Sequence, residues 1–201
     1  MEVLNNNNLT LIDPDTNHFD MHINFESYST SSFIAKDDID PHSLKLYHNN
    51  ACSIMADNGS KKDLYEIFLN KLRYPFDVLL FTETWITPDK VDQCHFNGYK
   101  PIHLLRPTDG SINFKTKGGG VSIFVKDHIH FKHRNDLVIM ESYIECTFIE
   151  LKFNNQKYLI GGIYRAPGKD IDRFNEAVNK LIEPLRSSHQ LILLGDFNVD
   201  L

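Results

Sequence analysis

The sequence lacks the features that mark membrane, secreted and zinc-binding proteins. No stretch approaches the roughly 20 consecutive apolar residues that a membrane-spanning helix needs, and residues 1–5 have neither the basic start nor the apolar core of a signal peptide. The three cysteines, Cys52, Cys94 and Cys146, lie far apart and form no Cys-x-x-Cys pair, which indicates neither a disulfide framework nor a zinc site. We therefore expect an intracellular protein, nuclear or cytoplasmic, that is not secreted, has no membrane contact and keeps its mostly buried thiols reduced.

An excess of one charge is also missing from most of the chain. The net charge is -6, and residues 1–45 account for all of it with eight acidic and two basic residues, so residues 46–201 are neutral. Within that neutral part, residues 100–134 hold seven basic and two acidic residues. Such a basic stretch could face a phosphate backbone, or it could consist of solvated loops that happen to be basic.

The residues that are present suffice for one globular domain. The chain has 201 residues, of which 41% are hydrophobic and 24% charged, a composition typical of a folded domain with a tail. Residues 1–43 contain an Asn5–Asn8 run, scattered acidic residues and no sustained hydrophobic period, which predicts an acidic, flexible N-terminal tail. The predicted domain is the patterned part, residues 44–201.

The patterned part alternates segments with strand-like and helix-like spacing. Apolar runs of strand length occur at Leu44–His48, Phe76–Phe81, Gly118–Val125, Tyr143–Phe153, Lys157–Tyr164 and Gln190–Leu194. Helical spacing predicts helices over Ser60–Arg73, with Leu64, Ile67, Phe68 and Leu72 on the apolar face, and over Asp170–Arg186, with Asp170 as the cap and Pro184 ending the last turn. This order predicts a mixed α/β layered domain that presents polar residues at the ends of its strands.

Two acidic residues stand at the ends of predicted buried strands, Glu83 in TETW (82–85) and Asp196 in GDFN (195–198). An unpaired carboxylate is unfavourable there unless a metal ion, a base or several hydrogen-bond donors stabilise it. Mg²⁺ takes one or two protein carboxylates and fills its other positions with water and phosphate oxygens. Together with Asn50 and Asn198, the two carboxylates predict a shared divalent-metal site, although either carboxylate alone could be a loop or helix cap.

Several longer phrases resemble the endonuclease/exonuclease/phosphatase superfamily. They are FTETW (81–85), GYKPI (98–102), GGGVSIFVKD (118–127), GGIYRAP (161–167) and LLGDFNVD (193–200). The set is most similar to the apurinic-type endonuclease domain of non-LTR retrotransposons, and the likeness covers residues 44–201. It implies an α/β fold, a layered β-sandwich flanked by helices as in deoxyribonuclease I. Residues 44–201 would be the N-terminal portion of that domain, incomplete at the C-terminus.

The resemblance also implies roles for five residues. Asn50 and Glu83 would hold the metal ion, Mg²⁺ or alternatively Mn²⁺. Tyr164 would direct its hydroxyl at the scissile phosphate, although a half-buried aromatic residue at a strand end is the other interpretation. Asp196 would orient or deprotonate the attacking water, and Asn198 would position that water and hydrogen-bond the phosphate. These roles match the water, base and donors that phosphodiester hydrolysis requires.

The sequence departs from the family pattern in two places. Cys52 stands where relatives often have arginine, which removes a phosphate or structural contact. The closing Ser-Asp-His phrase and a second catalytic Asp do not occur before Leu201, and neither the histidines of residues 128–133, expected in a surface loop, nor an exposed His189 replaces them by motif. We expect the 201 residues alone to be a poor nuclease, because losing one preorganised donor typically costs roughly 10²–10³ in rate.

The functional prediction is a Mg²⁺-dependent DNA endonuclease, a hydrolase that nicks target DNA for retrotransposition. Its partners would be DNA and, in an intact element, a downstream reverse transcriptase domain and the element RNA. Two alternatives stay open. One is a catalytically silent, truncated fragment that at most binds DNA, and the other is a phosphatase of the same superfamily.

Overall fold

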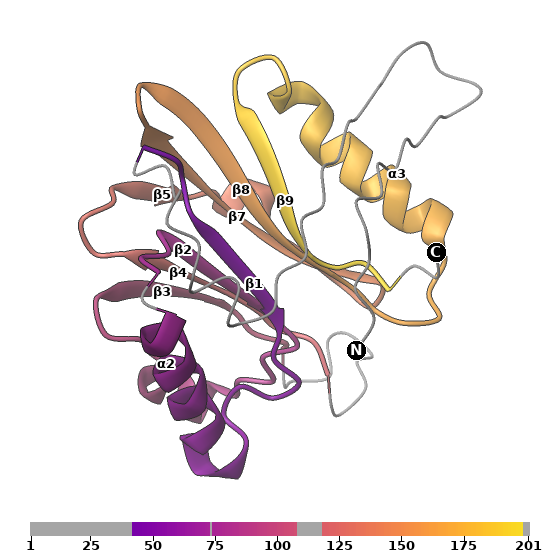
Figure 1. Cartoon of the computed structure of the whole chain (residues 1–201). Helices are drawn as coiled ribbons and strands as arrows, with labels where there is room; N and C mark the ends of the chain where they lie inside the picture. Colours follow the sequence, from indigo (N-terminus) through magenta and orange to yellow (C-terminus); the bar gives the residue numbers. More distant parts are fainter. Residues whose placement is uncertain (1–41, 73, 108–117, 199–201) are drawn as a thin grey trace, which may run out of the picture. The chain divides into compact units, whose positions relative to one another are not determined.

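The structure is a computed structural model that describes residues 42–72, 74–107 and 118–198 (Figure 1). All the helices and strands below belong to one compact unit. The predicted tail, residues 1–43, lies outside the described residues apart from His42 and Ser43, and so does Arg73, the predicted last residue of the first helix.

The described strands form two sheets. The order in the first sheet is β1 (Leu46–Asn50), β2 (Val78–Thr82), β4 (Val121–Lys126) and β3 (Tyr99–Leu104), with β1 parallel to β2 and the other neighbours antiparallel. The order in the second sheet is β5 (Phe131–His133), β7 (Ile144–Phe153), β8 (Gln156–Arg165) and β9 (Gln190–Asp196), and β6 (Ile139–Glu141) also pairs with β7. β8 and β9 are parallel. Both β1 and β9 are edge strands, and they lie against each other.

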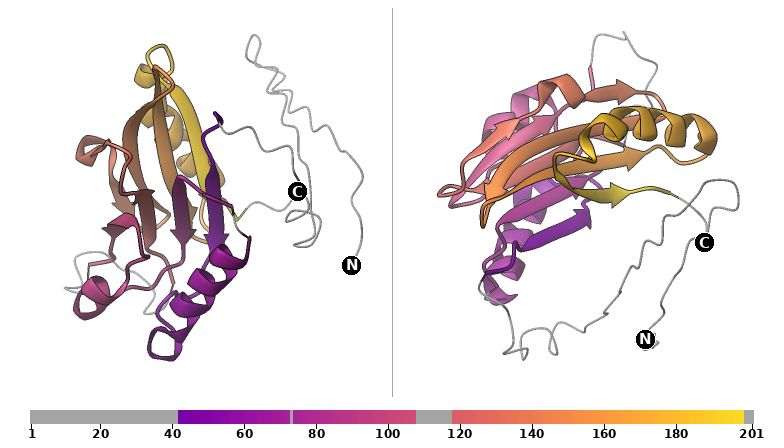
Figure 2. Two further views of the ribbon diagram at one scale, coloured as in Figure 1. Left: turned by 60° about the vertical axis from the view of Figure 1, so that its left-hand side comes forward. Right: turned by 90° about the horizontal axis from the view of Figure 1, so that it is seen from above.

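The two sheets pack face to face, and a helix covers the outer side of each (Figures 1 and 2). Val78 and Leu80 of β2 share one apolar cluster with Ile160 of β8, which is the core between the sheets. Phe81, the residue after Leu80, points to the other side and contacts Tyr65 of α2 (Ser60–Leu72) at 5.0 Å between ring centroids. On the second sheet, α3 (Ile171–Ile182) covers its outer face through Phe174. The predicted layered α/β arrangement is confirmed.

Helix α3 begins directly after Asp170, as the sequence predicts, but it ends at Ile182, four residues before the predicted Arg186. The Asp170 carboxylate accepts hydrogen bonds from the main-chain N–H groups of Asp172 (2.9 Å) and Arg173 (3.2 Å), which caps the first turn. Pro184 lies in the 3₁₀ turn η4 (Glu183–Leu185) that follows the helix. The other 3₁₀ turns among the described residues are η1 (Asp57–Gly59), η2 (Pro88–Gln93) and η3 (Asn135–Leu137).

The predicted apolar face of α2 is partly wrong. Leu72 is buried as expected, but Leu64 and Ile67 are 64% and 63% exposed. The side of α2 that meets the sheet carries Tyr65, because its ring packs against Phe81. Residues 65, 68, 69 and 72 have the same helical spacing as the predicted set, so periodicity alone does not separate the two faces.

Several strands differ from their predictions, among them the short strands β5 and β6, which were not predicted. β1 runs from Leu46 to Asn50 instead of covering 44–48, because Asn49 and Asn50 pair through their main chains with Phe81 and Thr82 and need no apolar side chains. β3 was not predicted, since it contains Pro101. A proline is tolerated in this strand because β3 lies at the edge of its sheet.

The cysteines differ in their exposure to solvent. All three cysteines are free, and Cys94 and Cys146 are buried as expected, whereas Cys52 is exposed. Within residues 42–72, 74–107 and 118–198, no helix combines the length and apolarity needed to cross a bilayer.

Candidate active site

The two pairs of parallel strands bring four of the predicted site residues to one rim of the sandwich. In the first sheet, Asn50 at the end of β1 is level with Thr82 at the end of β2, and Glu83 follows directly. In the second sheet, Tyr164 of β8 is level with Asp196 at the end of β9. Directly paired residues of neighbouring strands project to the same face of a sheet. Because Tyr164 belongs to the core between the sheets, Asp196 also faces the first sheet.

A hydrogen bond between the two sheets fixes the Asp196 carboxylate. Asn50 Nδ2 donates to Asp196 Oδ2 at 2.7 Å, and the main-chain N–H of Asn198 donates to Asp196 Oδ1 at 3.2 Å. Both carboxylate oxygens therefore have a donor, one from β1 and one from the loop after β9. The structure thus brings together three of the predicted residues at the end of β9.

Glu83 and Tyr164 also meet across the two sheets. The Tyr164 side chain lies beside the Glu83 carboxylate, and the tyrosine is 3% exposed. Burial raises the pKa of Tyr164, and the negative charge of Glu83 raises it further. The hydroxyl therefore keeps its proton and acts as a hydrogen-bond donor at neutral pH.

Two of the predicted residues have a strained backbone. Glu83 has φ +50° and Asn198 has φ +45°, in the left-handed region that non-glycine residues rarely adopt. Such residues persist only where the surrounding structure holds them, and they concentrate at functional sites. The strain at Glu83 and Asn198 therefore supports a functional role for both strand ends.

The glycine-rich run holds the loop that carries Glu83. Main-chain N–H groups of Thr84 and Trp85 donate to the carbonyl groups of Gly120 (3.2 Å) and Gly119 (3.1 Å). From the other side, the Ser53 N–H donates to the Glu83 carbonyl at 2.8 Å. Glu83 is therefore positioned by its neighbours on both sides rather than by its own short loop.

A buried ion pair lies beneath this run, and the sequence reasoning missed it. Arg106 Nε donates to Glu145 Oε1 at 2.7 Å, and the Gly120 N–H donates to Glu145 Oε2 at 2.5 Å. Burial raises the pKa of Glu145, and the charge of Arg106 opposes that rise. Glu145 is level with Tyr164 across β7 and β8, so the pair lies beside the site. The available signal was strand alternation within 143–153, which puts Glu145 on the same face as Ile149 and Leu151.

The ion pair gives the first mutational prediction. Gly119 and Gly168 share φ +70°, but a Cβ at Gly119 would lie 2.1 Å from Arg106 Nε, whereas one at Gly168 would meet nothing within 4 Å. Arg106 cannot move aside without leaving Glu145 unpaired, and breaking a buried pair costs about 3–5 kcal/mol. Gly119→Ala is therefore expected to lower the free energy of unfolding by at least about 2 kcal/mol more than Gly168→Ala.

Urea unfolding of both variants measures this difference. The backbone strain of alanine at φ +70° is common to the two, so their difference isolates the contact with Arg106. Equal losses of stability would show that the ion pair does not require a glycine at position 119.

One histidine beside the site was also missed. His48 precedes Asn50 by two residues on β1, so both side chains project to the same face. His48 Nε2 lies 3.3 Å from Thr82 Oγ1. Burial lowers the pKa of His48, and the neighbouring Asp196 carboxylate acts in the opposite direction. His48 belongs to none of the family phrases. Strand alternation indicates it, because it shares a face of β1 with Asn50.

The donor set suits a hard divalent cation with few protein ligands. In the described part of the chain, no three His, Cys, Asp or Glu side chains gather as a metal cluster, and the recorded ion pairs involve neither Glu83 nor Asp196. Mg²⁺ needs only one or two carboxylates. The Asn50 carbonyl accepts from the Cys52 N–H at 3.1 Å and keeps a second lone pair for a cation. Glu83 and Asn50 thus fit the predicted ion.

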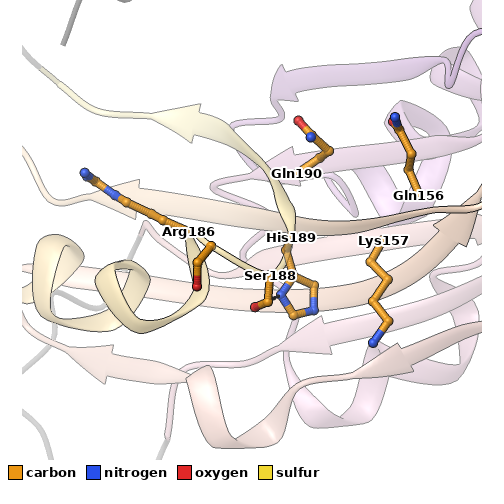
Figure 3. Close-up of a pocket in the computed structure, with 7 residues that line it drawn as sticks. Gln156, Lys157, Arg186, Ser188, His189 and Gln190 are labelled. Carbon is orange, nitrogen blue, oxygen red and sulfur yellow. Dashed lines mark hydrogen bonds between the residues drawn. The ribbon is translucent and has the colours of Figure 1, made fainter.

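A cavity at the other end of the second sheet is separate from this site. It has a volume of about 210 Å³ and is lined by Gln156, Lys157, Arg186, Ser187, Ser188, His189 and Gln190. Gln190 is six positions before Asp196 on β9, which places the cavity about 20 Å from the carboxylate. The side chains of Lys157 and Arg186 point in different directions, so their charges do not converge on one ligand (Figure 3).

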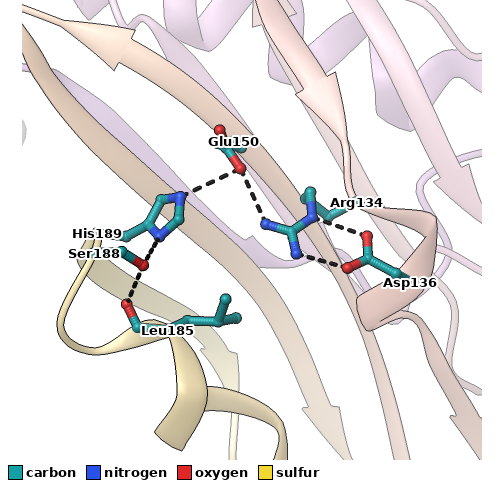
Figure 4. A network of polar contacts seen from close by, with 6 residues as sticks. All are labelled: Arg134, Asp136, Glu150, Leu185, Ser188 and His189. Atoms are coloured by element: carbon teal, nitrogen blue, oxygen red, sulfur yellow. Dashed lines mark hydrogen bonds and ion pairs between the residues drawn. The ribbon is translucent and has the colours of Figure 1, made fainter.

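A polar network next to the cavity has a structural role (Figure 4). Arg134 donates to Glu150 at 3.0 Å and to both carboxylate oxygens of Asp136 at 2.8 and 2.6 Å. His189 Nε2 lies 3.2 Å from Glu150, and its side chain is 9% exposed, so the prediction of an exposed His189 is wrong. His133 also departs from the expected surface loop, since it lies in β5 and contacts Thr147 at 2.9 Å.

Comparisons with known proteins agree with this fold. Residues 48–201 match the model of the Endonuclease/Exonuclease/phosphatase family. Comparison with curated proteins gave no match. Among solved structures, the endonuclease domain of TRAS1, a telomere-specific non-LTR retrotransposon, has 17% identity and a TM-score of 0.49 over 68% of this chain and 53% of that domain.

Two further structures have higher TM-scores. Humanized TDP2 of D. rerio has 12% identity and a TM-score of 0.54 over 78% of this chain and 67% of that one. An endonuclease/exonuclease/phosphatase family protein of Bacteroides thetaiotaomicron has 18% identity and a TM-score of 0.52 over 81% of this chain and 66% of that one. The chain therefore spans about half to two thirds of the length of these structures, and the expected layered fold of the superfamily is confirmed.

Proposed function

Because the chain belongs to the endonuclease/exonuclease/phosphatase family, whose members are hydrolases, we propose that it hydrolyses phosphodiester bonds in DNA with the help of Mg²⁺ or Mn²⁺. We propose further that it is the nicking endonuclease of a non-LTR retrotransposon. One observation carries the proposal. The Asn50–Asp196 hydrogen bond joins the two sheets at the same rim where Tyr164 lies beside Glu83.

Glu83 and Asn50 would hold the divalent ion, since they offer one carboxylate and one amide oxygen at adjacent strand ends. When bound, the ion supplies positive charge against the phosphate oxygens. The remaining steps belong to side chains of the second sheet and of the loop after it.

Asp196 is the proton acceptor in this proposal. Its two oxygens are oriented by Asn50 and by the N–H of Asn198. A carboxylate held in this way can orient a water molecule in line with the scissile bond and take its proton during attack. The hydrolysis then yields a free hydroxyl on one side of the nick and a phosphate on the other.

Tyr164 and Asn198 are the donors to the phosphate. The Asn198 side chain donates one hydrogen to the carbonyl of Arg165 at 2.7 Å, and its amide has a second hydrogen for a phosphate oxygen. The Tyr164 hydroxyl keeps its proton and lies beside Glu83. Donors fixed before the reaction stabilise charge as it develops, which is where such sites obtain much of their rate.

The raised pKa of Tyr164 predicts how its contribution depends on pH. Because burial and Glu83 raise this pKa above the ordinary value of 10.0, the hydroxyl keeps its proton as the pH rises to that value. Tyr164→Phe is expected to slow nicking roughly 10²-fold, by the same factor from neutral pH to about pH 10.

The nicking rates of the unaltered protein and of Tyr164→Phe, measured from neutral pH to about pH 10, give the ratio of the two rates directly. Tyr158→Phe serves as the matched control, since Tyr158 is also on β8 but its hydroxyl contacts only the exposed Gln156. A ratio that falls to one well below pH 10 would mean that the phenol loses its proton early, contrary to the proposal.

DNA is the proposed substrate, on the motif resemblance and on relatives of the same fold. One structure of similar fold, D. rerio TDP2, is described as complexed with a single-strand DNA product. The basic stretch adds little to this choice, because Arg106 and Arg134 are engaged in ion pairs, and its residues 108–117 lie outside the described residues. In an intact element, the further partners proposed are a reverse transcriptase domain and the element RNA.

The test uses the protein at its natural full length with supercoiled plasmid in Mg²⁺, in Mn²⁺ and in chelator. Metal-dependent conversion to nicked circles is expected. Release of phosphate from a small phosphomonoester without nicking would assign a phosphatase of the same family instead. DNA binding without either activity would favour the catalytically silent alternative.

A further inference from the structure

Arg165 is buried beneath the site, on the face of the second sheet opposite to Tyr164. It is the last residue of β8, and alternation along the strand turns it toward α3. Arg165 is 7% exposed. Its Nη1 donates to the main-chain carbonyls of Phe197 (3.3 Å) and Asn198 (2.5 Å), and its Nη2 donates to that of Lys169 (2.5 Å). The guanidinium thus joins the loop after β8 to the loop after β9.

Arg165 and Asn198 each donate a side-chain hydrogen bond to the main-chain carbonyl of the other. Asn198 Nδ2 donates to the Arg165 carbonyl at 2.7 Å, while the Arg165 guanidinium donates to the Asn198 carbonyl. Asn198 is also one of the strained residues, with φ +45°. Left-handed backbone at a non-glycine residue needs surrounding contacts to hold it, and Arg165 supplies two of them.

The same loop orients Asp196. The Asn198 N–H donates to Asp196 Oδ1, so a shift of residue 198 would release one oxygen of the carboxylate. Phe197, between these residues, points to the outer face and packs edge-on against Phe174 at 6.2 Å between ring centroids. Arg165 and Phe174 therefore hold the loop from behind, while Asp196 and Asn198 face the site.

The chemistry of Arg165 is unusual for a residue that only stabilises the fold. A buried guanidinium is costly unless it is paired, and the partners recorded for Arg165 are carbonyl groups rather than a carboxylate. Its Nε is buried without a hydrogen-bond partner in the described part of the chain. An apolar side chain would fill this position at lower cost, so the three carbonyl contacts need another reason.

We propose that Arg165 is a positioning residue that fixes Asn198, and through it Asp196, for phosphodiester hydrolysis. It does not touch the phosphate, because its guanidinium lies on the far face of the sheet. The catalytic part of this inference rests on the proposed function, whereas the positioning part concerns the loop alone. The two parts can be measured separately.

Hydrogen exchange tests the positioning part without any activity. Arg165→Met keeps the length of the stem and removes all three donated hydrogen bonds, and Arg165→Lys keeps the charge. Amide exchange in residues 195–198 is expected to speed up in Arg165→Met, less in Arg165→Lys, and to stay unchanged elsewhere. Arg173→Met is the matched control, since Arg173 also lies on this side of the sheet but stacks on Tyr143 at 4.2 Å.

Kinetics tests the catalytic part. Arg165→Met is expected to lower kcat for plasmid nicking roughly 10²-fold, the cost of a displacement of about 1 Å, with little change in KM for DNA. Asn198→Ala is expected to be similarly slow. Because Arg165 acts through Asn198, the double variant should be no slower than Asn198→Ala, and Arg165→Lys should recover part of the rate.

Each outcome decides one part. Unchanged exchange at residues 195–198 in Arg165→Met would overturn the proposal whether or not the protein is a nuclease. Losses that multiply in the double variant would show that Arg165 does not act through Asn198. If the unaltered protein does not nick DNA, the proposed function fails, and the exchange result still decides the role of Arg165.

Discussion

Replacing Glu83 with alanine is expected to lower the rate of Mg²⁺-dependent nicking by roughly 10³-fold while the fold stays intact. Glu83 is the carboxylate proposed to hold the ion, and a bound ion contributes several kcal/mol of charge stabilisation in the transition state. The residue is half-buried at a strand end, and its recorded main-chain contact would remain in the variant. Affinity for DNA should change little, because the loss concerns the transition state rather than ground-state binding.

Glu83→Gln separates charge from hydrogen bonding in the same experiment. Glutamine can accept a hydrogen bond from Tyr164 but carries no charge for a cation, so it should be nearly as slow as alanine. Glu176→Ala on the exposed side of α3 is the control for loss of a glutamate. The rise in melting temperature with added Mn²⁺ should be lost in both Glu83 variants. Unchanged nicking in either Glu83 variant would remove this residue from the mechanism.

Asp196→Asn is expected to reduce kcat by about 10²–10⁴-fold, the usual contribution of a positioned acid or base. Asparagine has almost the same shape, and its remaining oxygen can still accept a hydrogen bond from Asn50, so the two sheets stay linked. What the substitution removes is the capacity to take a proton. The melting temperature should be unchanged, which would show that the fold is intact. KM for DNA should stay close to that of the unaltered protein.

The control for this substitution is Asp172→Asn, which makes the same chemical change at an exposed position in the first turn of α3. It should leave nicking unaltered. An Asp196→Asn variant that retains a rate within about tenfold of the unaltered protein, below the contribution just cited, would contradict the assignment of Asp196 as the base.

The sequence predicts the layered α/β fold and the polar residues at the strand ends, because both depend on local patterns. Buried strands such as β2 begin with a continuous apolar run, Val78–Phe81, and the polar residues at their ends stand out against such runs. Parallel pairing then brings Asn50 level with Thr82 and Tyr164 level with Asp196. Pairing of this kind depends on the order of the strands in each sheet. The sequence predicts the class of fold but not this order.

The parts that were missed depend on contacts between residues far apart in the chain. Arg106 and Glu145 are 39 residues apart, and neither belongs to a recognisable spacing. The buried side of α2 follows from the position of Phe81 on the sheet, not from the helix, which has apolar residues on both sides. Arg165 was left without a role because a guanidinium beside a phosphate site is usually taken to bind phosphate, whereas here it binds carbonyl groups.

The position of β9 at the edge of the second sheet has a consequence for how the protein behaves in concentrated solution. Its seven residues, Gln190–Asp196, are mostly apolar and half-buried, and no strand among the described residues pairs with its outer side. Main-chain N–H and carbonyl groups on such a side are a template for one more strand, whether from a binding partner or from another copy. Charged residues that protect many natural sheet edges are absent between Gln190 and Gly195. This side of β9 is therefore where a further strand could pair, whether it comes from a later part of the protein, from a binding partner or from another copy.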